Sequence, residues 1–213
     1  MNGAVFLSAS VPDPEAPHFV GPADTIAVTS AVKALIYVVL GRRRLIWGGH
    51  PAITPMVWSA ADSMNVDYGA WVTLYQSRYF EDHYPQDNER FQNVVFTEAA
   101  DESVELGSTG SRELSLDLMR RQMFRDNTFS TAIFIGGMKG VIAEFELIAE
   151  YSRDVQRFPI LSTGGVTDRL VEILDLTDAV RSRLRSDVDY IPLFHDICDV
   201  ERGEHRVTRP ETD

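Results

Sequence analysis

Short apolar runs rich in β-branched residues alternate with longer amphipathic stretches along this chain. The short runs predict strands near residues 4–7, 44–47, 71–75, 93–96, 130–135 and 158–162. The stretches between them predict helices near 24–40, 54–64, 111–126 and 140–149, the first with Asp24 as its N-cap and Gly41 at its end. Strands that alternate with helices are typical of an α/β fold with a mainly parallel sheet. We therefore expect a three-layer, Rossmann-like domain.

The length of 213 residues fits one hydrophobic core rather than two separate ones. We expect residues 1–186 to form the Rossmann-like domain. Residues 187–213 should form a C-terminal extension, with a short helical part up to Val200 packed back on the body and a disordered tail from Arg202.

The charge and composition of the chain disfavour several classes of function. With 20 Lys and Arg against 32 Asp and Glu, the net charge of −12 disfavours a surface that follows nucleic acid. A single small anion could still bind at the N-terminus of a helix. The histidines and Cys198 show no metal-ligand spacing, so we predict no metal site and no cofactor, and we expect Cys198 to be a structural thiol.

The chain shows no membrane or export pattern. The apolar run at residues 34–40 is too short to cross a bilayer, and the first residues lack a basic start followed by an apolar stretch. Together with the single cysteine, this predicts a cytoplasmic protein with no membrane partner.

Three double-glycine turns each follow a predicted strand and precede a predicted helix: Gly48-Gly49, Gly136-Gly137 and Gly164-Gly165. Ser8-Ala9-Ser10 forms a fourth turn of small residues. In a parallel sheet such turns gather at the carboxyl ends of the strands, where ligands bind. Each turn alone could use glycine for steric reasons, but their common placement predicts a nucleotide-type site.

The spacing of the glycines excludes two common nucleotide-binding families. The first and second strands are not followed by Gly-x-Gly-x-x-Gly, and no segment matches Gly-x4-Gly-Lys-Ser/Thr. We therefore expect neither an ordinary dinucleotide dehydrogenase nor a P-loop NTPase.

Glu144 stands close to the second of these turns, near the start of the helix that begins about Gly140. A carboxylate near phosphate needs a separate task, such as binding a ribose hydroxyl or acting as an acid or base. Its alternative role is to complement the helix dipole. His50 could likewise donate to a ligand or simply stabilise its turn.

The run Gly136-Gly137-x-x-Gly140-x-x-x-Glu144 after a core strand, together with Arg120-Arg121 on an upstream helix, resembles the Rossmann-like SLOG superfamily. That superfamily includes the cytokinin-activating phosphoribohydrolases called LOG (Lonely Guy), which carry Pro-Gly-Gly-x-Gly-Thr-x-x-Glu. The resemblance covers roughly residues 4–170. Ile135 replaces the proline, Val141 replaces the threonine, and one extra residue precedes Gly140. With these departures the chain is more similar to another branch of the superfamily. The members of that branch are regarded as sensors of nucleotide-derived signals in bacterial defence.

The resemblance implies a homodimer that binds a nucleotide or nucleotide-derived signal. One of Arg120 and Arg121, about 100° apart on a helix, would neutralise phosphate, and Glu144 would hold a ribose hydroxyl. The expected ligand-binding residues are Ser8, Ala9, Ser10, Gly48, Gly49, His50, Gly136, Gly137, Met138, Lys139, Gly140, Thr163, Gly164 and Gly165. The alternative is a nucleoside 5′-monophosphate N-glycosidase with Glu144, Arg120 and Arg121 as catalytic residues. A purely structural role is the third possibility.

Overall fold

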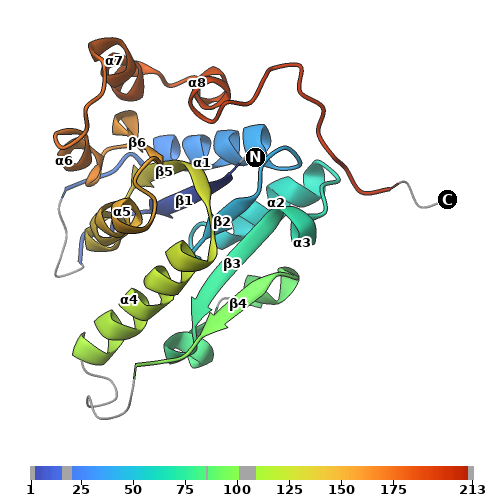
Figure 1. Cartoon of the computed structure of the whole chain (residues 1–213), viewed down its shortest axis with the longest axis vertical. Coiled ribbons are helices and arrows are strands. Elements are labelled where there is room, and N and C mark those ends of the chain that lie inside the picture. Colours follow the sequence, from blue (N-terminus) through green and yellow to red (C-terminus); the bar gives the residue numbers. More distant parts are fainter. Residues whose placement is uncertain (1–2, 16–20, 85, 101–108, 211–213) are drawn as a thin grey trace.

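A computed structural model describes residues 3–15, 21–84, 86–100 and 109–210 of the chain (Figure 1). Six parallel strands form one sheet in the order β4-β3-β2-β1-β5-β6. The strands are β1 (Ala4–Ser10), β2 (Leu45–Trp47), β3 (Val72–Ser77), β4 (Val94–Thr97), β5 (Phe129–Gly136) and β6 (Gln156–Ile160). The predicted α/β fold with a parallel sheet is therefore confirmed.

Helices cover both faces of the sheet and form the outer two layers (Figure 1). On one face lie α1 (Thr25–Val39), α2 (Thr54–Ser63), α7 (Asp178–Ser186) and α8 (Tyr190–Ile197). On the other lie α4 (Thr109–Asp126), α5 (Lys139–Tyr151) and α6 (Thr167–Val171). The connecting segments include α3 (Tyr68–Trp71) and the 3₁₀ turns η1 (Arg78–His83), η2 (Gln86–Arg90) and η3 (Leu161–Thr163). No helix of the described ranges is long and apolar enough to cross a membrane.

Local sequence explains several element boundaries. The Asp24 carboxylate accepts hydrogen bonds from the N–H groups of Ile26 (2.9 Å) and Ala27 (3.0 Å), as expected of an N-cap. β1 continues through Ser8-Ala9-Ser10, which the sequence placed in a turn, because these residues pair in register with residues 134–136 of β5.

Cys198 is buried, and this burial raises the pKa of its thiol to about 12, as suits a structural cysteine.

The side of the sheet to which successive strands are added changes at β1. The chain first lays β2, β3 and β4 on one side of β1 and then crosses to β5 and β6 on the other. In open parallel sheets ligands bind at the carboxyl ends of the strands, where the order reverses. Here that point lies between the ends of β1 and β5.

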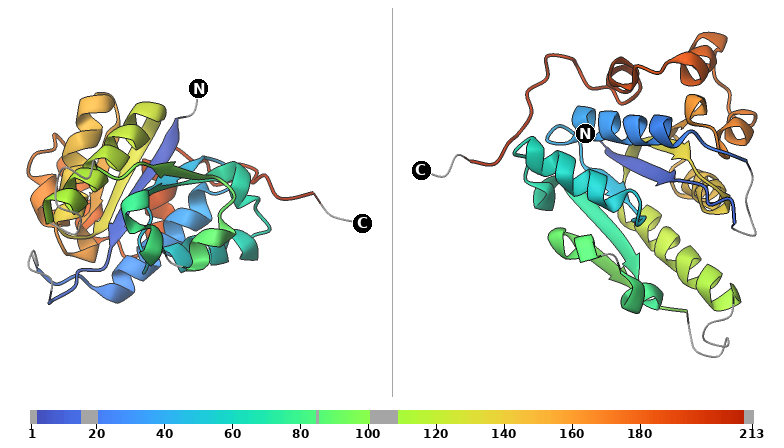
Figure 2. Two further views of the ribbon diagram at one scale, coloured as in Figure 1. Left: turned by 90° about the horizontal axis from the view of Figure 1, so that it is seen from below. Right: turned by 180° about the vertical axis from the view of Figure 1, so that it is seen from behind.

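The C-terminal segment after α8 follows a defined path, in contrast to the disordered tail that the sequence predicted from Arg202. Residues 202–210 pass the C-terminal end of α1 and run on toward the end of α2 (Figure 2), with Val207 N–H donating to the Gly41 carbonyl at 2.9 Å and Arg209 N–H to the Asn65 carbonyl at 2.7 Å. Residues 211–213 lie outside the described residues.

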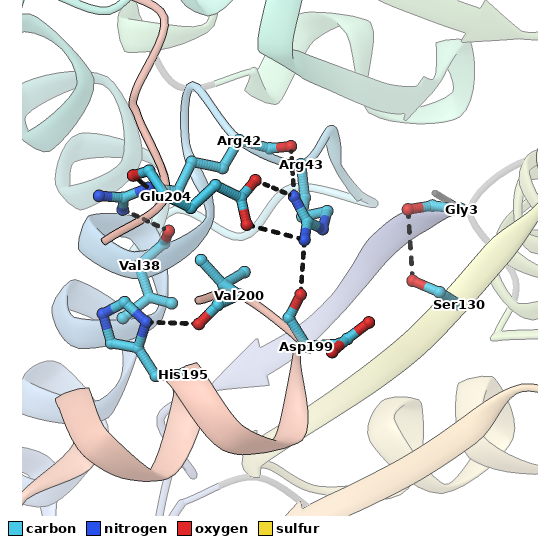
Figure 3. Close-up of polar contacts among 9 residues, drawn as sticks. All are labelled: Gly3, Val38, Arg42, Arg43, Ser130, His195, Asp199, Val200 and Glu204. Carbon is cyan, nitrogen blue, oxygen red and sulfur yellow. Dashed lines mark hydrogen bonds and ion pairs between the residues drawn. The ribbon is translucent and has the colours of Figure 1, made fainter. Parts of the chain in front are cut away.

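Arg43 attaches this segment to the body (Figure 3). Its side chain is only 8% exposed, forms an ion pair with Glu204, and donates to the Asp199 carbonyl at 2.5 Å. Arg42 Nε adds a hydrogen bond to the Glu204 carbonyl at 2.8 Å. A local view of the sequence could not find this contact, because its partners are separated by 161 residues.

We expect Glu204→Gln to destabilise the fold at neutral pH. The Arg43 guanidinium lowers the pKa of the Glu204 carboxyl below its ordinary value. A carboxyl whose pKa is lowered by folding stabilises the protein above its unfolded pKa, about 4.3, and loses that contribution as the pH falls through the folded value. Urea unfolding at pH 7 should show a loss of about 1–3 kcal/mol that shrinks in acid. Glu201→Gln, at an exposed position, serves as the control. An equal loss of unfolding free energy in the two variants would contradict a stabilising role of the Arg43–Glu204 ion pair.

Candidate functional site

Three polar side chains from three different elements meet at the carboxyl ends of β1 and β5. Ser8 of β1 donates its hydroxyl to Glu144 Oε2 at 2.5 Å, and Arg120 of α4 donates its Nε–H to Glu144 Oε1 at 3.1 Å. The arginine and glutamate side chains are 13% and 14% exposed, respectively. A partly buried carboxylate thus has a hydrogen-bond donor at each oxygen, which offsets the cost of taking its charge out of water.

The position of Glu144 in its helix weighs against the alternative that it complements the helix dipole. α5 begins at Lys139, so Glu144 lies in the second turn, and the first turn carries no acidic residue. The interaction of a charge with the helix dipole falls off beyond the first turn. The contacts with Ser8 and Arg120 are therefore the physical reason for the position of this carboxylate.

The two adjacent arginines point in different directions, as their spacing on the helix predicted. Arg121 is 43% exposed and pairs with Asp117 at 2.7 Å and Glu150 at 3.6 Å on the surface of α4 and α5. Arg120 alone reaches Glu144. The structure therefore brings Arg120 into the site and leaves Arg121 outside it.

The Gly136-Gly137 and Gly164-Gly165 turns pack directly on one another. All four glycines have positive φ, and a Cβ on Gly165 would lie 2.7 Å from the carbonyl carbon of Gly136. The predicted ligand-binding residue Thr163 joins the same contact by accepting the Gly136 N–H at 2.9 Å.

The N–H groups of these turns are largely used inside the protein. Gly137 donates to the Ser10 carbonyl (2.9 Å), Gly164 to that of Leu161 (3.1 Å) and Gly165 to that of Pro22 (3.1 Å). The structure thus gives these glycines a packing role that sequence reasoning missed, because the acceptors are distant in the chain. Contact of these turns with a ligand stays a prediction.

Gly48 and Gly140 serve a different purpose, since neither has positive φ. A Cβ on Gly140 would lie 3.1 Å from Arg120 Nη2, and one on Gly48 would lie 3.8 Å from Glu144 Oε1. Gly140 therefore leaves room beside the Arg120 guanidinium, whereas the tightest neighbour of a Cβ on Gly48 would be Met119 Cε, at 3.1 Å. Ala9, Ser10 and Met138 flank the same strand ends, whereas Lys139 forms an exposed ion pair with Glu113 at 2.5 Å.

His50 follows the Gly48-Gly49 turn and lies within electrostatic reach of Glu144. Burial lowers the pKa of its imidazole, and the negative charge of Glu144 opposes that shift. Nδ1 accepts the N–H of Ala52 at 3.2 Å, so the proton of the neutral ring is on Nε2. His50 is thus a neutral hydrogen-bond donor at pH 7.

Gln76 is a residue that sequence reasoning missed. It lies near the carboxyl end of β3, and its Nε2 donates to the Gly48 carbonyl at 3.0 Å, which positions the Gly48-Gly49 turn. The available signal was a polar residue at the end of an apolar strand, on the same sheet edge as the glycine turns.

The site combines features suited to an anionic ligand that also carries hydroxyl groups. A guanidinium carries five N–H donors, of which Glu144 takes one from Arg120. The first N–H groups of α5, near Gly140, have no acceptor within the helix. Among the described residues no group of three or more His, Cys, Asp and Glu side chains is placed to hold a metal ion.

A sequence model of the SLOG cluster3 family matches residues 18–198. The match includes Gly48, His50, Arg120 and Glu144, while Ser8 precedes it. No curated protein matches the chain.

We expect a double-mutant cycle to detect the Arg120–Glu144 contact without any ligand. Arg120→Met, Glu144→Gln and the double variant should give a coupling energy of about 1–3 kcal/mol in urea unfolding, because the pair is largely shielded from water. The exposed Arg121–Asp117 pair is the matched control, with Arg121→Met and Asp117→Asn expected to give a much smaller coupling energy, because water screens this pair. Equal coupling energies in the two cycles would contradict the stronger interaction that we expect between Arg120 and Glu144.

Proposed function

Because the chain belongs to the SLOG cluster3 family, we propose that it binds a nucleotide or a nucleotide-derived signal at the carboxyl ends of β1 and β5. The observation that carries this proposal is the Arg120–Glu144 pair at the point where the strand order reverses. A cation and a carboxylate side by side suit a ligand that joins a phosphate to a sugar.

The phosphate is expected beside Arg120 and the first turn of α5. Arg120 Nη2 lies over Gly140, as the 3.1 Å approach to a Cβ there indicates, so the guanidinium and the helix N-terminus face the same space. Both favour an anion. This local arrangement supports phosphate binding despite the net charge of −12.

The ribose is expected on the Glu144 side of this space. A carboxylate accepts hydrogen bonds from sugar hydroxyls, and Ser8 and Arg120 fix the direction of its oxygens. The neutral His50 adds a donor near the same carboxylate.

The second candidate is hydrolysis of the N-glycosidic bond of a nucleoside 5′-monophosphate, in which water replaces the base on the ribose. The same carboxylate favours it, because an anion beside the ribose would stabilise the positive charge that develops as the base leaves. In both functions Arg120 holds the phosphate.

A thermal-shift screen with Arg120→Ala and Arg121→Ala tests the binding site. A nucleotide at 100 times its dissociation constant should stabilise the wild type by about 2.7 kcal/mol, or roughly 5–10 °C. Arg120→Ala should weaken binding of that nucleotide by about 10–150-fold in calorimetry, as expected for loss of a hydrogen bond to a charged group. Arg121→Ala, its neighbour on the exposed side, should bind like the wild type. Equal losses in the two variants, or no shift with any nucleotide, would reject the site.

Glu144→Gln separates binding from hydrolysis. In a binding protein the variant should lose about 1–3 kcal/mol of ligand affinity, and neither protein should consume the ligand. In a glycosidase the wild type should release free base from nucleoside monophosphates, and the variant should do so roughly 10²–10⁴-fold more slowly. Chromatography of overnight reactions distinguishes the two, and we expect no base release.

A further inference from the structure

A hollow of about 610 Å³ lies between α1, α2 and the first turn of α8, on the sheet face that these helices cover (Figure 1). We call it the α1–α2 groove. All of its lining residues belong to the described ranges, and none belongs to the predicted ligand-binding set at the strand ends. Its volume falls in the range of small-molecule sites. The groove is therefore a candidate for a separate binding site.

The walls of the α1–α2 groove are mainly apolar and include Ala34, Tyr37, Met56, Ala60, Met64 and Ile191. Tyr37 and Ile191 are 49% and 41% exposed, so large apolar side chains there remain in contact with water. The lining residues extend over positions 30–37 and 55–64, which correspond to about 10–14 Å along the helices. A linear chain of roughly eight to ten carbon atoms has this length. Covering the walls with such a chain would remove apolar surface from water.

The charge of the groove favours an anion. Lys33 is the only charged side chain among the described residues that line it. Although the chain has 32 acidic residues, no carboxylate of the described ranges forms an ion pair with Lys33. An unpaired cation beside apolar walls attracts an anion that carries an apolar body. A single lysine in a protein of net charge −12 suits a monoanion better than a phosphate dianion.

The C-terminal segment lies at one end of the groove. The guanidinium of Arg206 lies over the Tyr37 ring, 4.7 Å from its centroid, and its Nη1 donates to Met64 Sδ at 2.7 Å. Because one side chain touches both residues, Tyr37 and Met64 lie at the same end of the groove. Arg206 adds a second positive charge there, one helical turn beyond Lys33. We therefore expect the anionic group toward this end and the apolar chain toward Pro55.

We propose that the α1–α2 groove binds a linear aliphatic monocarboxylate of about eight to ten carbon atoms, with its carboxylate paired to Lys33 and its chain along the apolar walls. This site goes beyond the nucleotide site proposed above. It needs neither Arg120 nor Glu144, so either proposal can fail without the other.

Octanoate, decanoate, decan-1-ol and decylamine are the probes, used below the concentrations at which they form micelles. By calorimetry decanoate should bind the wild-type protein about 4–15-fold more tightly than octanoate, because two further methylene groups are buried. Decan-1-ol, which has the same chain without the charge, should bind about 2–5-fold more weakly than decanoate. Decylamine should bind more weakly still, because Lys33 repels its charge. In amide NMR spectra, decanoate should shift resonances of residues 30–37 and 55–64 rather than those of residues 8, 48–50 and 137–144.

Variants of Lys33 test the position of the carboxylate. Lys33→Met keeps the apolar stem and should lower the affinity for decanoate to that for decan-1-ol, which should not change. Lys33→Glu should reverse the order, so that decylamine binds more tightly than decanoate. Both substitutions are at an exposed position, and so is the control Arg153→Met just after α5, which should bind decanoate like the wild type.

Several outcomes would overturn the proposal. They are equal affinities for decanoate, decan-1-ol and decylamine, equal losses in Lys33→Met and Arg153→Met, and no binding at millimolar decanoate. Resonance shifts confined to the strand-end residues would also overturn it, because the carboxylate would then occupy the nucleotide site.

Discussion

The parallel pairing of β1 with β5 is the constraint on which the candidate site depends. Seven residues of β1 align with β5, so that Ser8 and the start of α5 emerge at the same edge of the sheet. This alignment brings the Ser8 hydroxyl and the Glu144 carboxylate together across 136 residues of sequence. The packing of Gly165 on Gly136 then sets how closely the next βα turn approaches. A slip of one residue in the β1–β5 register would turn Ser8 to the opposite face and remove this contact.

Local patterns in the sequence were sufficient to predict the alternation of strands and helices, the Asp24 cap and the double-glycine turns, but not that Ser8-Ala9-Ser10 would extend β1. They also placed Glu144 near a turn and predicted that at most one of Arg120 and Arg121 could face the site. These features depend on periodicity and short-range chemistry. The use of the glycine N–H groups, the Gln76–Gly48 contact and the ordered residues 202–210 depend on partners far away in the chain. A dimer, a cytoplasmic location and the boundary at residue 186 stay predictions.

Arg43 and Arg120 show how the same side chain can serve structure or a site. The terminal nitrogens of Arg43 bind the Arg42 and Asp199 carbonyls and the Glu204 carboxylate, so its donors are directed into the protein. Arg120 binds Glu144 through Nε, while its Nη2 lies over the glycine at the start of α5. Both guanidiniums are largely shielded from water, where a charge interacts strongly with whatever faces it. The orientation of Arg120 is therefore the feature that favours an anionic ligand over a purely structural ion pair.

The contacts of Glu144 also bear on whether a bound nucleotide would be hydrolysed. Both carboxylate oxygens already accept hydrogen bonds, Oε1 from Arg120 and Oε2 from Ser8, so fewer of their lone pairs remain to orient an attacking water. His50 could donate from Nε2, but a neutral imidazole is a much weaker acid than an imidazolium. The extra residue between Gly137 and Gly140 further separates this loop from the LOG pattern, and catalysis tolerates little displacement of its groups. A carboxylate held by the Ser8 hydroxyl and the Arg120 guanidinium suits the binding of a sugar phosphate, and for this reason we favour recognition over turnover as the proposed function.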